Sequence, residues 1–366
     1  MTSKTKYKII TMTTVLFMGM MTLFAWIKPA DTFSQSERRR LEQFPEISLE
    51  TFLSGKFMSD FESYAKDQFP LREGFRRLKA LFATEVLNQG DNNGIYIVDG
   101  YAGKLDYPLN ETGLLRAAER FRYIYDRYMA ETDVNVYFSM IPDKNYFLAE
   151  ENGYPSMDYE ELFQKMLENT DYMEYIDITD LLSIEDYYKT DIHWRQEEII
   201  DVAKRLMGRM GRPMSLKYKV DTLDQPFYGV YYGQSALPLK AEEIHYLTNE
   251  MLDDCLVYDW QNDQSSSVYD MEKAHGRDPY EIYLSGALSL ISIENPAAAS
   301  DAELILFRDS FGSSIAPLFI EGYSKITLVD IRYIHPDLLG KYMEFKDQDV
   351  LFLYSTSVLN HGETIK

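Results

Sequence analysis

Residues 303–317 read Glu303-Leu-Ile-Leu-Phe-Arg-Asp-Ser-Phe-Gly-Ser-Ser-Ile-Ala-Pro317, and this stretch decides the fold class. Its apolar run predicts a buried strand that enters a tight turn at Asp309 and Ser310. A helix is expected two or three residues later, which is the strand–turn–helix order of a parallel α/β sheet. In such a sheet this turn lies at the carboxyl ends of the strands, where ligands bind.

Strands and helices alternate on both sides of this stretch. Apolar strands separated by helices predict a parallel sheet that helices cover on both faces. Residues 211–300 break the alternation and form a β-rich insertion, with strands expected at 255–260, 280–284 and 288–293. The other expected strands are 134–141, 175–178, 303–307, 325–330 and 349–354, and the expected helices are 111–130, 159–168, 195–210, 313–321 and 336–343.

Ser310 stands where a serine can project its Oγ into the cleft at the strand ends. The amide of the following Phe311 and the helix N-terminus can stabilise a developing oxyanion there. A structural alternative exists, because Asp309 and Ser310 are also residue types that cap helices.

Asp191 and His193 lie two residues apart, just ahead of a predicted helix. In an extended stretch such residues point the same way, so the carboxylate can accept from the imidazole Nδ1–H and leave Nε2 free as a base. Helix capping, with His193 a hydrogen-bonded core residue, explains the same pattern. A serine nucleophile needs a base, and the base needs an orienting group. The two segments together therefore predict a triad of Ser310, His193 and Asp191.

The order Asp191-Ile-His-Trp194, followed by Asp309-Ser-Phe-Gly312, resembles the DHHW family and the related alginate O-acetyltransferase proteins of the SGNH hydrolase superfamily. The resemblance implies a three-layer α/β/α sandwich in which the predicted triad is catalytic. Its motif order is permuted relative to ordinary SGNH enzymes, because His193 precedes Ser310. Further similar segments are 67–72, 93–96, 141–145 and 329–333.

Two residues depart from the pattern that this resemblance sets. Ile192 stands where the DHHW family has its first histidine, and only the second histidine would be catalytic. Arg308 stands where ordinary SGNH enzymes have glycine before Asp-Ser. The turn at Asp309 and Ser310 is therefore expected to differ in detail from the turn of those enzymes.

Three further residues follow predicted strands at the same edge of the sheet. Arg332 and Asn360 correspond to the places where such enzymes put oxyanion donors. Asn360 either donates its side-chain amide there or is solvated near the C-terminus. Arg332 and Lys144 each bind an acidic sugar or form an ion pair, which for Arg332 would be with Asp330.

A tyrosine-rich loop, residues 226–236, lies within the β-rich insertion. Its aromatic rings, among them Tyr232, suit the faces of sugar rings. They also suit a protein interface or core packing, and the chain has 29 tyrosines, which favours packing.

The chain is strongly acidic. Its 366 residues include 37 Lys+Arg and 59 Asp+Glu, a formal net charge of −22, and the four charged residues before Pro29 are all lysines. A body this negative repels phosphate backbones, so nucleic-acid binding is disfavoured. Hydrophobic residues make up 45% of the chain, enough for a core, which excludes general disorder.

No signature for a nucleotide, a metal or another cofactor occurs in the sequence. The single cysteine, Cys255, excludes an internal disulfide and reads as a small buried hydrophobe. None of the five histidines has a His or Cys at metal-ligand spacing. They are His193, His245, His275, His335 and His361.

The N-terminus predicts export of the protein. Residues 9–27 are uncharged and follow three lysines, which indicates a membrane anchor with a cytoplasmic N-terminus. A cleaved signal peptide is the alternative, and it would make the protein secreted. We expect an anchor over 1–28, a helical stem over 29–92 and an SGNH-like catalytic domain over 93–366.

These features predict an extracytoplasmic O-acyltransferase, with O-acetyl transfer to a cell-surface polysaccharide as the expected reaction. The resemblance implies a multi-pass membrane O-acyltransferase as the partner that delivers the acyl group. A carbohydrate acetylesterase with the same triad is one alternative, and a catalytically silent glycan-binding or scaffolding component is another. A neutral glycan is the easier expectation for a body this acidic.

Overall fold

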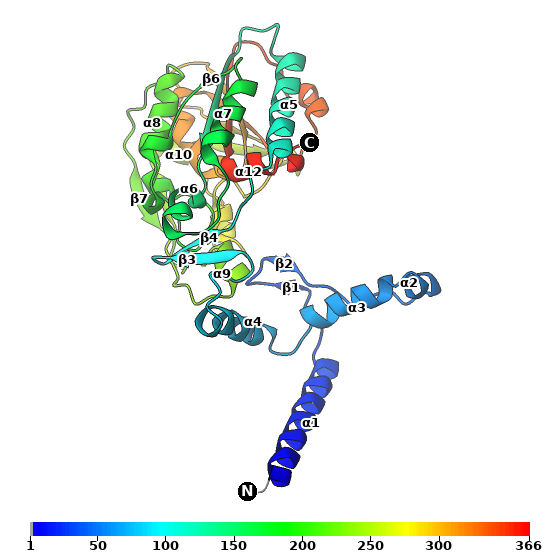
Figure 1. Ribbon diagram of the computed structural model, residues 1–366. Coiled ribbons are helices and arrows are strands. Elements are labelled where there is room, and N and C mark those ends of the chain that lie inside the picture. The colour runs from blue at the N-terminus through cyan, green and yellow to red at the C-terminus, as the bar shows by residue number, and fades with distance from the viewer. Residues whose placement is uncertain (1–2) are drawn as a thin grey trace. The chain divides into compact units, whose positions relative to one another are not determined.

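A computed structural model describes residues 3–366 (Figure 1). It divides into two compact units. The first contains the chain up to Asn93 together with Tyr232–Pro238, and the second contains Gly94–Tyr231 and Leu239–Lys366.

The first unit begins with the helix α1, Ser3–Ile27, which is long and apolar enough to cross a membrane and has no buried residues. It is the one such helix in the described part of the chain. A short antiparallel strand pair and a series of amphipathic helices follow. Their bounds are β1 Phe33–Ser34, β2 Arg39–Arg40, α2 Leu49–Leu53, α3 Lys56–Asp67, α4 Arg72–Leu81 and a π-helical turn over Phe82–Val86.

An eight-stranded sheet forms the centre of the second unit, in the order β10-β9-β11-β13-β12-β14-β5-β6. The five strands from β13 to β6 are parallel, as the alternation of strands and helices predicts. The insertion adds β11, β9 and β10 to one edge, each antiparallel to its neighbour. The strands are β5 Asn135–Ile141, β6 Glu174–Tyr175, β9 Leu256–Asp259, β10 Gln264–Ser266, β11 Leu290–Glu294, β12 Glu303–Arg308, β13 Lys325–Val329 and β14 Asp349–Ser355.

Helices cover both faces of this sheet, so the expected α/β sandwich is confirmed (Figure 1). Side chains alternate along β12: Leu304 and Leu306 enter one hydrophobic cluster, and Ile305 and Phe307 enter the other. The first cluster includes side chains from α8 and a 3₁₀ helix, and the second includes side chains from α5 and α7. These helices are α5 Glu111–Tyr128, α7 Tyr159–Asn169, α8 Ile200–Arg209 and the 3₁₀ helix Ala316–Gly322.

Smaller elements complete the second unit. They include two antiparallel strand pairs, β3 with β4 and β7 with β8, and several short helices. Their bounds are β3 Ile95–Val98, β4 Tyr101–Lys104, α6 Lys144–Leu148, β7 Lys219–Thr222, β8 His245–Thr248, α10 Glu250–Asp253, α11 Gly312–Ile315 and α12 Thr356–Asn360, and α9, Val230–Ser235, lies where the chain passes into the first unit.

Three expected elements differ from the structure. The strand predicted at 280–284 is wrong, because Pro279–Ile282 forms a 3₁₀ helix that Asp278 caps through the Tyr280 amide. The apolar pattern of this segment reflects burial of its side chains in the core and not pairing in a sheet. The helix predicted at 313–321 is α-helical only over α11, since Pro317 lacks the amide that an α-helix needs. Residues 336–341 also form a 3₁₀ helix.

Candidate active site

The turn after β12 is held by the carboxylate of Asp309. One oxygen of Asp309 accepts from the Phe311 amide at 3.0 Å, and the other accepts from the amide and hydroxyl of Ser355 at 2.8 and 2.6 Å. These bonds join the turn to the end of β14. Gly312 lets the chain fold back closely, since a Cβ there would lie 2.6 Å from the Cβ of Arg308.

Ser310, His193 and Asp191 lie in one hydrogen-bonded chain. The Ser310 Oγ is 2.8 Å from His193 Nε2, and His193 Nδ1 is 2.6 Å from Asp191 Oδ1. Asp191 and His193 are buried and Ser310 is partly exposed. This geometry allows a proton to pass from the serine hydroxyl to the imidazole while the carboxylate fixes the tautomer.

The Asp191 carboxylate has a second support on its other oxygen, which accepts from the Val230 amide at 2.8 Å. The neighbouring Gly229 passes close against this loop, because a Cβ there would lie 2.4 Å from the Cβ of Asp191. Its amide donates to the Thr190 hydroxyl at 2.8 Å. The carboxylate of Glu242 in turn accepts from the amides of Lys189 and Thr190, both at 2.6 Å.

Lys144 is buried beneath the same loop. Its ammonium group donates to the carbonyl oxygens of Tyr188, Lys189 and Asp191 at 2.8 to 3.1 Å. Burial lowers the pKa of Lys144 from 10.5 to about 7. Lys144 therefore positions the loop that carries Asp191.

The ring of His193 lies between two aromatic side chains. Tyr280 stacks on it with ring centroids 3.9 Å apart, and Phe311 lies 5.1 Å away at 60°. The Tyr280 hydroxyl and the Trp194 Nε1–H both donate to the Ser314 hydroxyl, at 2.9 and 2.8 Å. The imidazole is thus held by packing on its face and by a hydrogen bond on each nitrogen.

A cavity of about 140 Å³ opens beside Ser310 and Phe311. Asp143, which also lines it, is half-buried and accepts hydrogen bonds from Tyr159, Thr356 and the Asn145 amide. Burial, only partly offset by these bonds, raises the pKa of Asp143 from 3.8 to about 6. The other lining residues used below are Lys144, Arg332 and His361.

Two residues expected as oxyanion donors are engaged elsewhere in this structure. The Phe311 amide donates to Asp309. The buried Asn360 donates its side-chain amide to Asp106 at 2.9 Å and accepts from the Asn110 amide at 2.7 Å, so it is neither solvated nor at the serine. Its bond to Asn110 links the N-cap of α5 to the C-terminal segment.

The remaining expected residues have definite partners. Arg332 lines the cavity and donates to both oxygens of Asp330 at 2.9 and 2.7 Å, which is the ion-pair alternative. Tyr232 belongs to the first unit, where its hydroxyl accepts from Arg77 at 2.9 Å.

Arg308, the departure from glycine, is fully buried under the turn. Its guanidinium donates to the Asp309 and Leu288 carbonyl oxygens at 3.3 and 3.4 Å and lies 3.8 Å from Asp330. Burial lowers the pKa of Arg308. The triad distances show that the turn accommodates this side chain.

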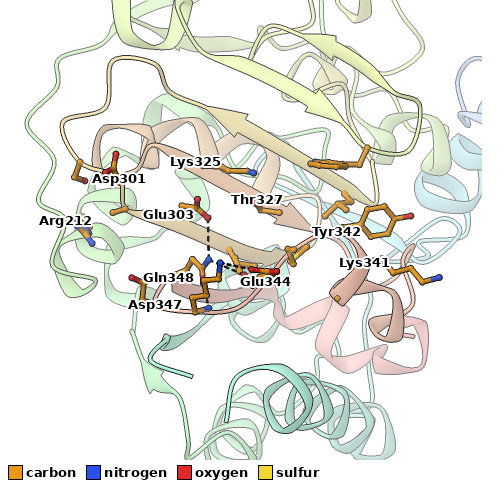
Figure 2. Close-up of a pocket in the computed structure, with 18 residues that line it drawn as sticks. Arg212, Asp301, Glu303, Lys325, Thr327, Lys341, Tyr342, Glu344, Asp347 and Gln348 are labelled. Atoms are coloured by element: carbon orange, nitrogen blue, oxygen red, sulfur yellow. Dashed lines mark hydrogen bonds and ion pairs between the residues drawn. The ribbon is translucent and has the colours of Figure 1, made fainter. Parts of the chain in front are cut away.

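A larger cavity, of about 830 Å³, lies away from these residues (Figure 2). It is lined by Glu303 and Lys325, which begin β12 and β13, and by Gln348 just before β14. It is therefore at the amino ends of strands whose carboxyl ends carry Ser310. Its polar side chains include hydrogen-bonded pairs such as Gln348 with Glu303. None of the triad residues lines it.

Some residues of the site could not be recognised in the sequence. Tyr280 carried a strand-like pattern, and Glu242 carried no signal. Gly229 and Val230 lie in the tyrosine-rich loop, whose aromatic residues suggested sugar binding or packing. It is the backbone of these two residues that supports Asp191. Cys255 is buried, and among residues 3–366 no group of three His, Cys, Asp or Glu side chains is placed to hold a metal.

Comparison with solved structures supports the fold. A DHHW family protein from Eubacterium siraeum has a TM-score of 0.60 and 21% identity, covering 75% of this chain and 94% of that one. PatB1 from Bacillus cereus, solved with a sulfonyl adduct, has a TM-score of 0.56 and 18% identity, covering 72% and 95%. The O-acetyltransferase domain of Pseudomonas putida AlgJ is also similar, with a TM-score of 0.47 and 9% identity, covering 73% and 92%. No protein-family model and no curated protein matches the sequence.

Proposed function

We propose that the chain, which has the SGNH-like α/β fold of these structures, is a serine O-acyltransferase. The observation that carries the proposal is the hydrogen-bonded chain from Ser310 through His193 to Asp191. A serine with a buried, doubly supported base beside a cavity is the arrangement that covalent acyl transfer requires.

In the first step the Ser310 Oγ attacks the carbonyl carbon of an acyl donor, and His193 Nε2 takes the hydroxyl proton. The imidazolium is stabilised by Asp191, whose other oxygen stays bonded to the Val230 amide. Collapse of the tetrahedral intermediate breaks the bond to the leaving group, which takes the proton from His193. In the second step an acceptor hydroxyl loses its proton to His193 and attacks the acyl-serine. The bond from the acyl carbon to Ser310 Oγ then breaks, and Oγ takes the proton back from His193, which restores the free serine and the neutral imidazole.

The amide of Ser310 itself is the backbone donor that we assign to the oxyanion. It has no hydrogen-bond partner among residues 3–366, whereas the Phe311 amide is bonded to Asp309. An amide that has no partner in the protein is available to a developing negative charge.

The cavity beside Ser310 favours a short acyl group such as acetyl, because its volume is about 140 Å³. We assign a cell-surface glycan as the acceptor and a multi-pass membrane acyltransferase as the source of the acyl group. The apolar helix α1 would anchor the chain in the membrane that holds that source.

The full chain in detergent should hydrolyse p-nitrophenyl acetate, and a sulfonyl fluoride should inactivate it. Ser310→Ala should abolish both effects, and Ser313→Ala, a change in the adjacent helix, is the matched control. If an oligosaccharide is added and an acetylated oligosaccharide forms, the result supports transfer. Release of acetate alone from an acetylated glycan supports an esterase. Turnover that persists in Ser310→Ala contradicts the proposal.

A further inference from the structure

The segment that follows α1 exposes many apolar side chains. Leu49 and Leu53 are each 77% exposed, and Phe52 and Met58 are each 60% exposed. Globular proteins rarely leave so many large apolar groups together in water. We call the set Phe44, Ile47, Leu49, Phe52, Leu53, Phe57, Met58 and Phe61 the stem apolar face.

Aromatic rings hold this face together. Phe44 lies in edge contact with Tyr64 at 5.4 Å and with Phe61 at 6.1 Å between ring centroids, and Phe57 stacks on Phe61 at 6.0 Å. Phe52 of α2 also contacts Phe57 at 6.1 Å, so the rings form one continuous surface across the connection from α2 to α3, and Phe44, Phe52 and Phe61 remain exposed.

The helix α3 is amphipathic, with its apolar residues on one side and its polar residues on the other. Phe57, Met58, Phe61, Tyr64 and Ala65 recur at helical spacing on one side. The opposite side is polar. Its exposed residues include Ser59, Glu62, Ser63 and Lys66.

The end of α3 is tied to the chain that leaves α1. The Gln68 side chain accepts from the Asp31 amide and donates to the Asp31 carbonyl, both at 2.8 Å. Asp31 is only four residues beyond Ile27, a reach of about 14 Å at full extension. If α1 spans a membrane, the C-terminal end of α3 must therefore lie close to that membrane's surface.

Charge is compatible with this position. Residues 28–93 contain 10 Lys+Arg and 11 Asp+Glu, whereas residues 94–366 contain 24 and 48. The stem is nearly neutral and is not repelled by anionic lipid, in contrast to the acidic catalytic unit.

We propose that the stem apolar face inserts into the outer leaflet of the bilayer that α1 crosses, so that α2 and α3 lie in the membrane interface. Amphipathic helices with aromatic apolar sides bind membranes in this way. The proposal concerns attachment and does not depend on the reaction at Ser310.

The test uses the full chain in phosphatidylcholine–phosphatidylglycerol vesicles and a fluorescent thiol label. Burial raises the pKa of Cys255 to about 12, so the parent chain should stay unlabelled. Leu53→Cys and Met58→Cys place the label on the apolar face, and Ser63→Cys places it on the polar side of α3 as the matched control.

Labels at 53 and 58 should be quenched by a headgroup-level lipid nitroxide at least several-fold more than the label at 63, and iodide in the water should show the reverse order. Equal iodide quenching at all three positions would overturn the proposal. Protection at 53 and 58 from both quenchers would also overturn it, because a second copy or another protein would then cover the face.

Discussion

Tyr280 lies parallel to the imidazole of His193, with 3.9 Å between the ring centroids and 7° between the ring planes. Asp191 and Ser310 hold the two imidazole nitrogens by hydrogen bonds, but these two bonds leave the ring free to tilt about the line that joins them. The stack restricts this tilt, so Tyr280 is a positioning residue for His193.

Replacing Tyr280 should therefore impair catalysis as well as folding, because its ring is buried in the core. Tyr280→Ala should lower kcat for p-nitrophenyl acetate by about tenfold, which corresponds to an aromatic contact of about 1.4 kcal/mol. Tyr280→Phe keeps the stack and loses only the bond to Ser314, so it should retain most of the activity. Steady-state kinetics beside thermal unfolding curves measure both effects. Equal activity of Tyr280→Ala and the parent would rule out the positioning role.

Adding a single methyl group at Gly229 should also lower the activity. Gly229→Ala places a Cβ at 2.4 Å from the Asp191 Cβ and must displace the carboxylate. A displacement of about 1 Å at a catalytic group costs on the order of a hundredfold in kcat. Gly208 on α8 has open space around the added Cβ and serves as the control. Similar losses in Gly229→Ala and Gly208→Ala would show that the close approach is unimportant.

Much of this arrangement could be predicted from local sequence. The apolar run before Asp309 predicts a strand, and the spacing of Asp191 and His193 places both side chains on one side of an extended segment. These inferences need only neighbours in the chain. A parallel sheet with helices on both faces followed from the alternation of strands and helices, but the order of its strands did not.

Contacts between distant residues could not be predicted in this way. Asn360 bonds to Asp106 across 254 residues, and nothing near Asn360 indicates that partner. The Phe311 amide could not be assigned either, because its acceptor depends on how Asp309 turns toward Ser355. The position of Tyr280 was hidden because a buried 3₁₀ helix and a buried strand share the same apolar composition.

Lys144 should contribute to stability in a pH-dependent way. Its pKa falls from 10.5 to about 7 on folding because of burial, so between these values the unfolded chain holds a proton that the folded chain has lost. The parent should therefore gain stability relative to Lys144→Met as the pH rises from 7 to 10, by at most about 1.4 kcal/mol per pH unit. Urea unfolding at several pH values measures the difference. A gap that narrows with rising pH would contradict this assignment.

Asp143 should show the opposite trend at lower pH. Burial raises its pKa from 3.8 to about 6, so between these values the folded chain holds a proton that the unfolded chain has released. The stability of the parent relative to Asp143→Asn should fall as the pH rises from 4 to 6. The same unfolding experiment detects it, and a rising relative stability over this range would show that the folded state favours the carboxylate.

The central claim is that Ser310 carries the acyl group. The most direct measurement is peptide mass spectrometry of the full chain after rapid acid quenching from p-nitrophenyl acetate. We predict a single acetyl group on Ser310 that accumulates within one turnover and is absent from His193→Ala. Acetylation of Ser313 or Ser314 instead, or an acetyl-serine that forms equally well without His193, would contradict the account.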